Sequence, residues 1–303
     1  MSLDADYIVD RRRLKRRLLF WRLFAVLSLT VVATLIALRF DTAEFGDSIA
    51  RLNVSGIIVE DIDRDVALLE LAEDNNVRAL VVRIDSPGGT VVGGESLYRS
   101  LRAVADKKPV IAVMGTTATS AAYMTAIAAD YIVAREGSIT GSIGVLMQTA
   151  NITGLLDKLG IEPESIKSGP LKAQPNPFEQ TSPAARKAVQ DVVMDMHAMF
   201  VDLVAQRREM ARDVALSLAD GRIYTGRQAL SNGLIDTLGG EAEARQWLFR
   251  NKDISTDLPI HDVEIHHEEE TWQRVFSGMV GKTLFSERLR LDGLVSLWHP
   301  EGW

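Results

Sequence analysis

Three short segments of this sequence carry residue types that suit acyl-transfer chemistry. In residues 115–124 (GTTATSAAYM), Ser120 follows an apolar stretch and opens a run of small residues. A Pro-Gly-Gly turn with Gly88 and Gly89 follows another apolar stretch, and Lys172 lies in a loop rich in glycine and proline. A serine hydroxyl can attack a carbonyl carbon, N–H groups at a glycine turn can hold the oxyanion, and a lysine can take the serine proton.

Each segment taken alone also has a purely structural interpretation. A serine before a helix commonly caps it, a Pro-Gly-Gly turn commonly serves only to join a strand to a helix, and loop lysines are usually solvated. A partly buried lysine gives up its proton more readily, because desolvation disfavours the ammonium form. The chain has no cysteine, and all five histidines lie at or after His197. A nucleophile is therefore expected to be an oxygen, with lysine rather than histidine as its base.

Several other chemistries lack their motifs. A phosphate-binding loop is excluded at Gly281, because Phe276 stands where its first glycine is needed, and neither H-E-x-x-H nor G-x-S-x-G occurs. The absence of cysteine removes disulfides, zinc ribbons and iron–sulfur sites. An acidic body also argues against a nucleic-acid duplex as the main partner.

The elements that must position these residues alternate along the chain. Short apolar runs separated by helical patterns predict an α/β domain with a mainly parallel sheet. Strands are expected at 57–59, 79–84, 110–114 and 131–134, and helices at 66–72, 94–105 and 121–129. A long helix is expected to start at Ser182 with Pro183 in its first position. Its apolar stripe is expected to pack into the core: Val189, Val192, Val193, Met196, Phe200 and Leu203.

Charge is distributed unevenly over the 303 residues. Residues 1–40 hold eight basic and three acidic side chains, a net charge of +5, while the other 263 residues carry −12. Residues 18–38 are predominantly apolar, with Arg22 as their one charged residue, and at about 1.5 Å per residue these 21 residues span roughly 30 Å, the thickness of the hydrocarbon core. The sequence predicts a signal anchor with a cytoplasmic N-terminus and an exported body after Phe40. A cleaved signal peptide and a buried core helix are the alternatives.

Five regions are expected from these patterns. They are a cytoplasmic basic N-terminus (1–17), a transmembrane anchor (18–39), a linker (40–50), a catalytic domain (51–250) and a C-terminal extension (251–303) to which no role is assigned. Within the extension, the charged run at 266–270 is expected to be a solvated surface.

The motifs together resemble the signal peptide peptidase A (SppA) family of membrane-anchored serine proteases, serine peptidase family S49, in its short, single-repeat form. The matching stretches are SPGG at 86–89, TSAAYMTAIAADYIVA at 119–134, TGSIGV at 140–145, IKSGPLK at 166–172 and DGRIYTGRQALSNGLIDTLGG at 220–240. They follow the order found in the family.

The resemblance implies a role for individual residues. Ser120 is the nucleophile, and Lys172, the last residue of the S-G-x-x-K pattern, is the general base and acid; Lys167 is the competing candidate. Gly88 or Gly89, with the N–H of Ala121, is expected to form the oxyanion hole.

A possible supporting residue and one departure from the family pattern complete the expected site. Ser168 is a candidate for orienting Lys172 through a hydrogen bond. Many members read Ser-Gly-Gly where this chain reads Ser120-Ala121-Ala122, and the added methyl groups are compatible with the start of a helix.

The resemblance also implies an architecture and a reaction. The fold is a Clp protease/crotonase-like superhelix of ββα units, preceded by one transmembrane helix. Subunits assemble into a homo-oligomer in which the Ser-Lys dyad can be shared between adjacent chains. The activity is hydrolysis of apolar peptides, including remnant signal peptides, at the bacterial inner (cytoplasmic) membrane, with a periplasmic or extracytoplasmic body and with no metal or other cofactor. The alternatives are a catalytically inactive assembly module, which the Ser-Ala-Ala departure would explain, and a crotonase-like acyl-CoA enzyme.

Overall fold

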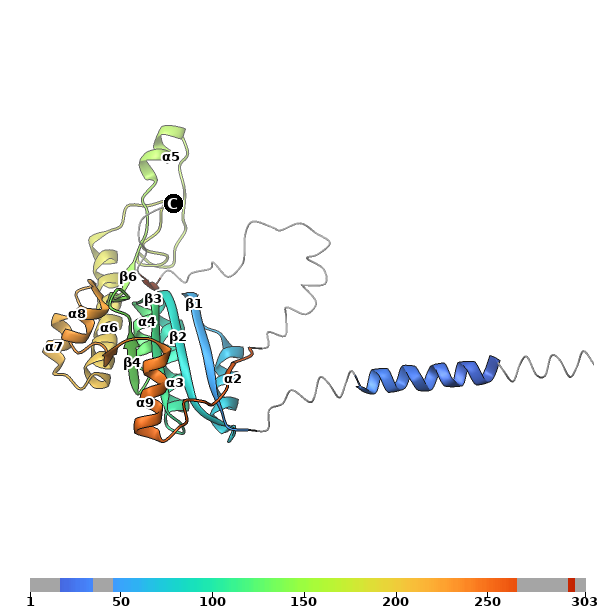
Figure 1. Cartoon of the computed structure of the whole chain (residues 1–303). Helices are drawn as coiled ribbons and strands as arrows, with labels where there is room; N and C mark the ends of the chain where they lie inside the picture. Colours follow the sequence, from blue (N-terminus) through green and yellow to red (C-terminus); the bar gives the residue numbers. More distant parts are fainter. Residues whose placement is uncertain (1–16, 35–45, 266–293, 298–303) are drawn as a thin grey trace, which may run out of the picture. The chain divides into compact units, whose positions relative to one another are not determined.

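Two separate units make up the part of the protein that the structure describes. The computed structural model describes residues 17–34, 46–265 and 294–297, and every structural statement below concerns those residues (Figure 1). The first unit contains the helix Arg17–Thr34, which is long and apolar enough to cross a membrane, and the second begins at Asp47. The basic residues before Arg17 and the charged run at 266–270 lie outside the described residues.

The second unit alternates strands and helices, which confirms the α/β class. Every expected strand and helix is present, although the first three strands are longer than predicted and the helix after Ser120 is shorter. The predicted Pro-Gly-Gly turn is wrong, because residues 87–89 continue the second strand, which runs to Thr90 beside its neighbours. The elements are β1 (Ser48–Ile58), α2 (Ile62–Glu73), β2 (Val77–Thr90), α3 (Val91–Ala105), β3 (Val110–Thr119), α4 (Ala121–Ala126), β4 (Tyr131–Ala134), β5 (Ile139–Gly141), β6 (Leu146–Met147), α5 (Thr153–Leu159), α6 (Pro183–Arg207), α7 (Arg212–Ser217), β7 (Ile223–Thr225), α8 (Gly226–Ser231), β8 (Thr237–Leu238), α9 (Glu241–Lys252), β9 (Ile260–Asp262) and β10 (Leu294–Leu297).

The strands β1, β2, β3 and β4 lie side by side and run parallel. Their register places Leu52, Val82, Ala112 and Ile132 in one row across the sheet. Parallel neighbours need a crossover connection, and α2, α3 and α4 supply it between successive strands. The carboxyl ends of the strands therefore meet at one edge, where helices α3 and α4 begin.

Each of the long strands is divided into two parts. The pairing of β1 with β2 shifts between Ser55 and Ile57, and that of β2 with β3 shifts after Ile84. The first part of β3 pairs with β4, whereas its last three residues, 117–119, pair with β5. Two strand segments followed by a helix form the ββα unit, so the superhelix of ββα units is the architecture of this chain.

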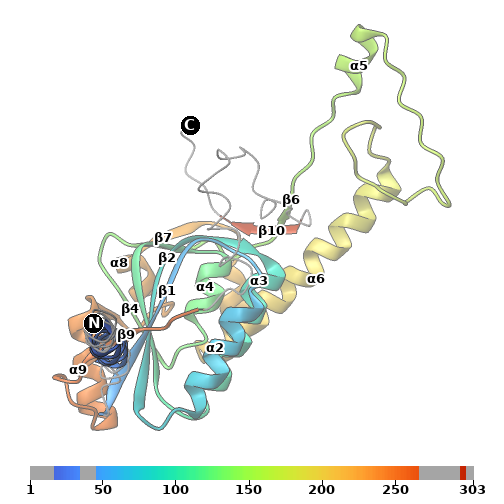
Figure 2. The same ribbon diagram turned by 90° about the vertical axis from the view of Figure 1, so that its right-hand side faces the viewer.

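Helices cover both faces of the sheet, which explains the continuous apolar strands. Leu80, Val82 and Ile84 face the core shared with α2, α3 and α4, whereas Ala79 and Val81 belong to the core shared with α9. Figure 2 shows α9 on one side of the sheet and α2, α3 and α4 on the other. Strands buried on both faces lose the alternation of polar and apolar residues.

A segment that we call the arm, α5 with residues 160–182, extends from this body (Figure 2). Helix α5 buries none of its residues, and the arm exposes several large apolar side chains: Leu155, Leu159, Ile161, Ile166, Leu171 and Phe178. As predicted, α6 follows the arm with Ser182 as its N-cap and Pro183 at its start. The prediction for its apolar stripe is correct at buried Phe200 and wrong at Val192, because the first half of α6 lies beyond the sheet and buries only Ala185.

The two halves of α6 should respond differently to truncation. Phe200→Ala is expected to lower the free energy of unfolding by about 3–5 kcal/mol, because it removes a fully buried ring. Met194→Ala, at a half-exposed position of the same helix, should change it by less than about 0.5 kcal/mol. Urea unfolding of the full chain in detergent measures both, and equal losses would contradict an uncovered first half of α6.

Candidate active site

Ser120 lies at the junction of β3 and α4 in an unusual backbone conformation. Its φ of 59° and ψ of −123° are sparsely populated by residues other than glycine, and the residue is only 1% exposed. Conformations of this kind cost on the order of 1–3 kcal/mol and cluster at active sites. The Ser120 hydroxyl makes no capping hydrogen bond to α4, so the alternative in which this serine only caps the helix is wrong.

Hydrogen bonds from two distant segments hold this junction. The Ser120 N–H donates to the Gly141 carbonyl at 2.8 Å, and Thr140 Oγ1 donates to the Ala118 carbonyl at 2.7 Å. On the other side, Thr119 Oγ1 donates to the Pro87 carbonyl at 2.9 Å. The SPGG, TSAAYM and TGSIGV stretches, which are separate in sequence, therefore meet around the serine.

The candidate oxyanion donors differ in how they are used. The Gly88 N–H donates to Ser86 Oγ at 3.1 Å, and this hydroxyl donates in turn to the Gly56 carbonyl at 2.6 Å. Gly89 lies so close to β1 that a Cβ there would stand 1.8 Å from the Ile58 carbonyl oxygen. Ala121 is the first residue of α4, where a backbone N–H has no acceptor within the helix. The Ala121 N–H is thus better placed to donate than the Gly88 N–H, while Gly89 is paired with β1 and β10, and the oxyanion hole stays a prediction.

The Ser-Ala-Ala departure is accommodated by the packing of α4. Ala121 and Ala122 are fully buried, and neither has a positive φ. Gly94 of α3 faces Ala121, and a Cβ on Gly94 would stand 2.9 Å from the Ala121 Cβ. The methyl group of Ala121 therefore fits beside α3 because residue 94 on that helix is a glycine and has no side chain.

Lys172 lies in the arm, not beside the serine. The arm extends away from α4 in both views, and Lys172 is exposed whereas Ser120 is buried (Figures 1 and 2). A single chain therefore does not bring the side chains of Ser120 and Lys172 together. The predicted partial burial of Lys172 is also absent from the single chain, because the body does not cover the arm. Ser168 is also exposed, and in the described residues no hydrogen bond joins it to Lys172. The assignment of the dyad stays a prediction.

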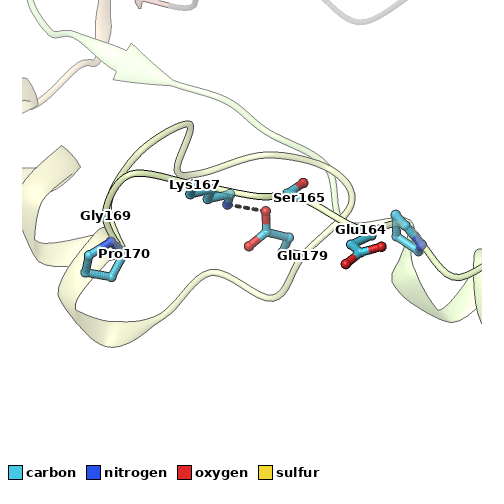
Figure 3. A pocket seen from close by; sticks show the side chains of 7 residues that line it. Glu164, Ser165, Lys167, Gly169, Pro170 and Glu179 are labelled. Atoms are coloured by element: carbon cyan, nitrogen blue, oxygen red, sulfur yellow. Dashed lines mark hydrogen bonds and ion pairs between the residues drawn. The ribbon is translucent and has the colours of Figure 1, made fainter.

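Lys167, the competing base, is already engaged. Its Nζ donates to the carboxylate of Glu179, and its side chain is only 16% exposed (Figure 3). A lysine that holds a carboxylate in this way is occupied as a hydrogen-bond donor, which makes Lys172 the freer of the two for proton transfer.

Near the serine, the edge of β2 that β3 leaves is occupied by β10. β10 pairs antiparallel with β2 at residues 88–90, and its other edge pairs with β6. One edge of β2 pairs with β1 as far as Gly89. The other edge pairs with β3 up to Ser86, which lies opposite Ala118, and with β10 beyond that point. This edge therefore accepts an added antiparallel strand near the point where β3 ends before Ser120.

Sequence reasoning did not find three residues that shape the site. Ser86 bridges two backbone segments, Gly141 receives the serine N–H, and Gly94 makes room for Ala121. Ser86 and Gly141 lie within the motifs that resemble the family, so the motifs gave a signal for them. Gly94 gave none, because only the helix packing shows its neighbour.

The fold places a buried serine in a strained turn of an α/β domain, and comparisons with known proteins show the family. The model of peptidase family S49 matches residues 102–255. The chain is 40% identical to the slr0021 protein of Synechocystis sp., named a presumed protease, over 66% of this chain and 72% of that one. It is 32% identical to a presumed signal peptide peptidase SppA of Enterococcus faecium, over 71% and 67% of the two chains.

Among solved structures, a mutant of the 1510-N membrane-bound stomatin-specific protease aligns with 72% of this chain and 98% of its own. The TM-score is 0.48 and the identity 14%. From the family match and the sequence relatives, the chain belongs to peptidase family S49. It is a serine peptidase of that family, and the resemblance drawn from its motifs is confirmed.

The close contact at Gly141 gives a test of the geometry around the serine. Gly141 has a φ of 83°, and a Cβ there would stand 2.5 Å from the Tyr224 ring. Gly141→Ala should displace the carbonyl that holds Ser120 and slow labelling by a fluorophosphonate probe about tenfold or more. Gly137→Ala is the control, because its Cβ would meet nothing within 4 Å. Equal labelling of both variants would show that the Gly141 contact does not position the serine.

Proposed function

We propose that this chain is a membrane-anchored serine endopeptidase in which Ser120 is the nucleophile and Lys172 the general base and acid. The observation that carries the proposal is the buried serine in a strained turn, beside a strand edge with which the chain's own β10 pairs. The helix Arg17–Thr34 supports an anchor, and the basic residues that precede and begin it favour a cytoplasmic N-terminus with the body on the periplasmic or extracytoplasmic side.

The reaction follows the Ser-Lys variant of acyl transfer. Neutral Lys172 takes the proton of Ser120 Oγ as the oxygen attacks the carbonyl carbon of the peptide. The N–H groups of Gly89 and Ala121 stabilise the negative charge on the carbonyl oxygen. Lys172 then donates its proton to the leaving amine as the C–N bond breaks, and water activated by the same lysine hydrolyses the acyl-enzyme.

The substrate is an extended, apolar peptide that adds a strand to the sheet. β10 occupies the edge at residues 88–90 and pairs there through its main chain, which is how strand addition gains affinity without strict sequence choice. Remnant signal peptides fit this description, because they are apolar and are released at the membrane.

The active form is a homo-oligomer in which one chain supplies the serine and a neighbour the lysine. The exposed position of Lys172, and the exposed apolar side chains of the arm and of the first half of α6, support this arrangement. Burial of apolar surface contributes about 25 cal/mol per Å². A second chain that covers the arm would therefore stabilise the assembly and also desolvate Lys172.

Two variants test the dyad and its sharing between chains. Ser120→Ala and Lys172→Met should each reduce peptide hydrolysis to background, with the oligomer intact by size-exclusion chromatography. Mixing the two variants before assembly should restore activity, to about a quarter of the wild-type value if chains combine at random in a cyclic oligomer. Full activity of either variant would reject the dyad, and no recovery on mixing would reject its sharing between subunits.

The C-terminal strand gives a second test. Because β10 occupies the edge proposed for substrate, removal of residues 291–303 should lower KM for an added peptide about threefold or more and leave kcat nearly unchanged. The measurement is hydrolysis of an apolar fluorogenic peptide by the truncated and full-length proteins. An unchanged or higher KM would place substrate at another edge.

A further inference from the structure

A cluster of polar side chains lies in the arm and centres on one carboxylate. Glu179 accepts hydrogen bonds from Lys167 Nζ, from Asn176 Nδ2 at 2.9 Å and from Gln174 Nε2 at 2.8 Å. Figure 3 shows Lys167 and Glu179 pointing toward each other across the hollow that they line. We call these four residues the Glu179 cluster.

The Glu179 cluster closes the loop that carries Lys172. Lys167 and Glu179 stand at the two ends of residues 167–179, and their contact joins the ends. Closing a loop of this length has an entropic cost that must be offset by the contacts at its ends. Hydrogen bonds in which both partners are ionised are the stronger kind, so this pair is well suited to hold the loop closed.

The same cluster fixes the backbone next to Lys172. The Lys172 N–H donates to the Gly169 carbonyl at 3.2 Å, and Ala173 has a positive φ of 57°. Asn176, which already donates to Glu179, also donates to the Ala173 carbonyl at 2.8 Å. A residue other than glycine keeps such a conformation only where its surroundings hold it. Glu179 therefore acts on the turn after Lys172 through Asn176.

The chemistry of the cluster requires a carboxylate at its centre. Three donors converge on two oxygens, and only an ionised carboxylate accepts on both. The hydrogen bond from Lys167, and then that from Asn176, lower the pKa of Glu179 from its usual value, so it is ionised at neutral pH. A glutamine would turn an NH₂ group toward one of the donors and lose that bond.

We propose that Glu179 is the positioning residue of the general base. It holds loop 167–179 closed so that Lys172 is presented to the serine in one geometry, and Lys167 serves this closure and not proton transfer. The inference rests on the proposed role of Lys172. Because proton transfer requires a precise approach, a loop that opens leaves the peptide bound but lowers the fraction of bound substrate that reacts.

The first experiment compares Glu179→Gln with Glu164→Gln in the full-length oligomer. Glu164 lines the same hollow and is exposed, and the described residues give it no hydrogen bond. Glu179→Gln should lower kcat and the rate of fluorophosphonate labelling about 10- to 100-fold, with KM within about twofold of wild type. Glu164→Gln should match wild type. Unchanged kcat in Glu179→Gln, or a loss that appears only in KM, would overturn the positioning role.

A second experiment separates this inference from the proposed dyad. Lys172→Met should abolish labelling of Ser120, while Lys167→Met should only slow it, because the Asn176 and Gln174 bonds to Glu179 persist. If Lys172→Met labels normally, the proposed dyad fails, whatever Glu179→Gln does. If Lys172→Met is inactive and Glu179→Gln is normal, only the positioning role fails.

Mixed assemblies then show through which chain Glu179 acts. Glu179→Gln should lower the recovered activity about 10- to 100-fold when it is placed in the Ser120→Ala chain, which supplies the lysine. In the Lys172→Met chain, which supplies the serine, Glu179→Gln should leave the recovered activity unchanged. This second placement also shows whether the substitution disturbs assembly. Loss in both placements would assign Glu179 to assembly and would overturn its role in positioning Lys172.

Discussion

The backbone of Ser120 is the constraint on which the rest of the site depends. A positive φ at a serine is stable only if its neighbours enforce it, and three groups do so here. Gly141 accepts the Ser120 N–H, the Ser120 carbonyl accepts the N–H of Met124, and α4 is buried along its whole length. Because the short helix cannot shift in a close-packed core, the fold holds the strained backbone of Ser120 in place.

The molecule divides the requirements of catalysis between a rigid body and an uncovered arm. The body, with helices on both faces of its sheet, holds Ser120 and the Gly88–Gly89 segment of β2 in packed surroundings. The arm has no core of its own and orders its loop through polar contacts around Glu179 instead. This division agrees with the proposed sharing of the dyad, since one chain holds a buried serine and an exposed Lys172 in the arm.

Much of the fold could be predicted from the sequence, because local patterns reflect local forces. The apolar runs at 79–84 and 110–114 are strands, and the Ser182-Pro183 pair starts α6, since burial and capping act over a few residues. The stripe of α6 was predicted wrongly at Val192, because periodicity indicates a face but not whether anything covers it. The length of α4 was overestimated, since its last turn tightens at Ala128 and Ala129 into bonds with residues three positions earlier.

The sequence by itself determined the residue types available for catalysis, the α/β class and the family. No cysteine is present, the histidines fall late in the chain, and the motifs stand in the order of their relatives. Only the tertiary structure decided which segments meet: it brings Gly141 and Pro87 to the two sides of the serine turn, sets Gly94 against Ala121, and places Lys172 in an arm away from the body. The physical reason is that these relations arise between residues far apart in the chain, where packing and strand register, rather than local propensity, set the distance.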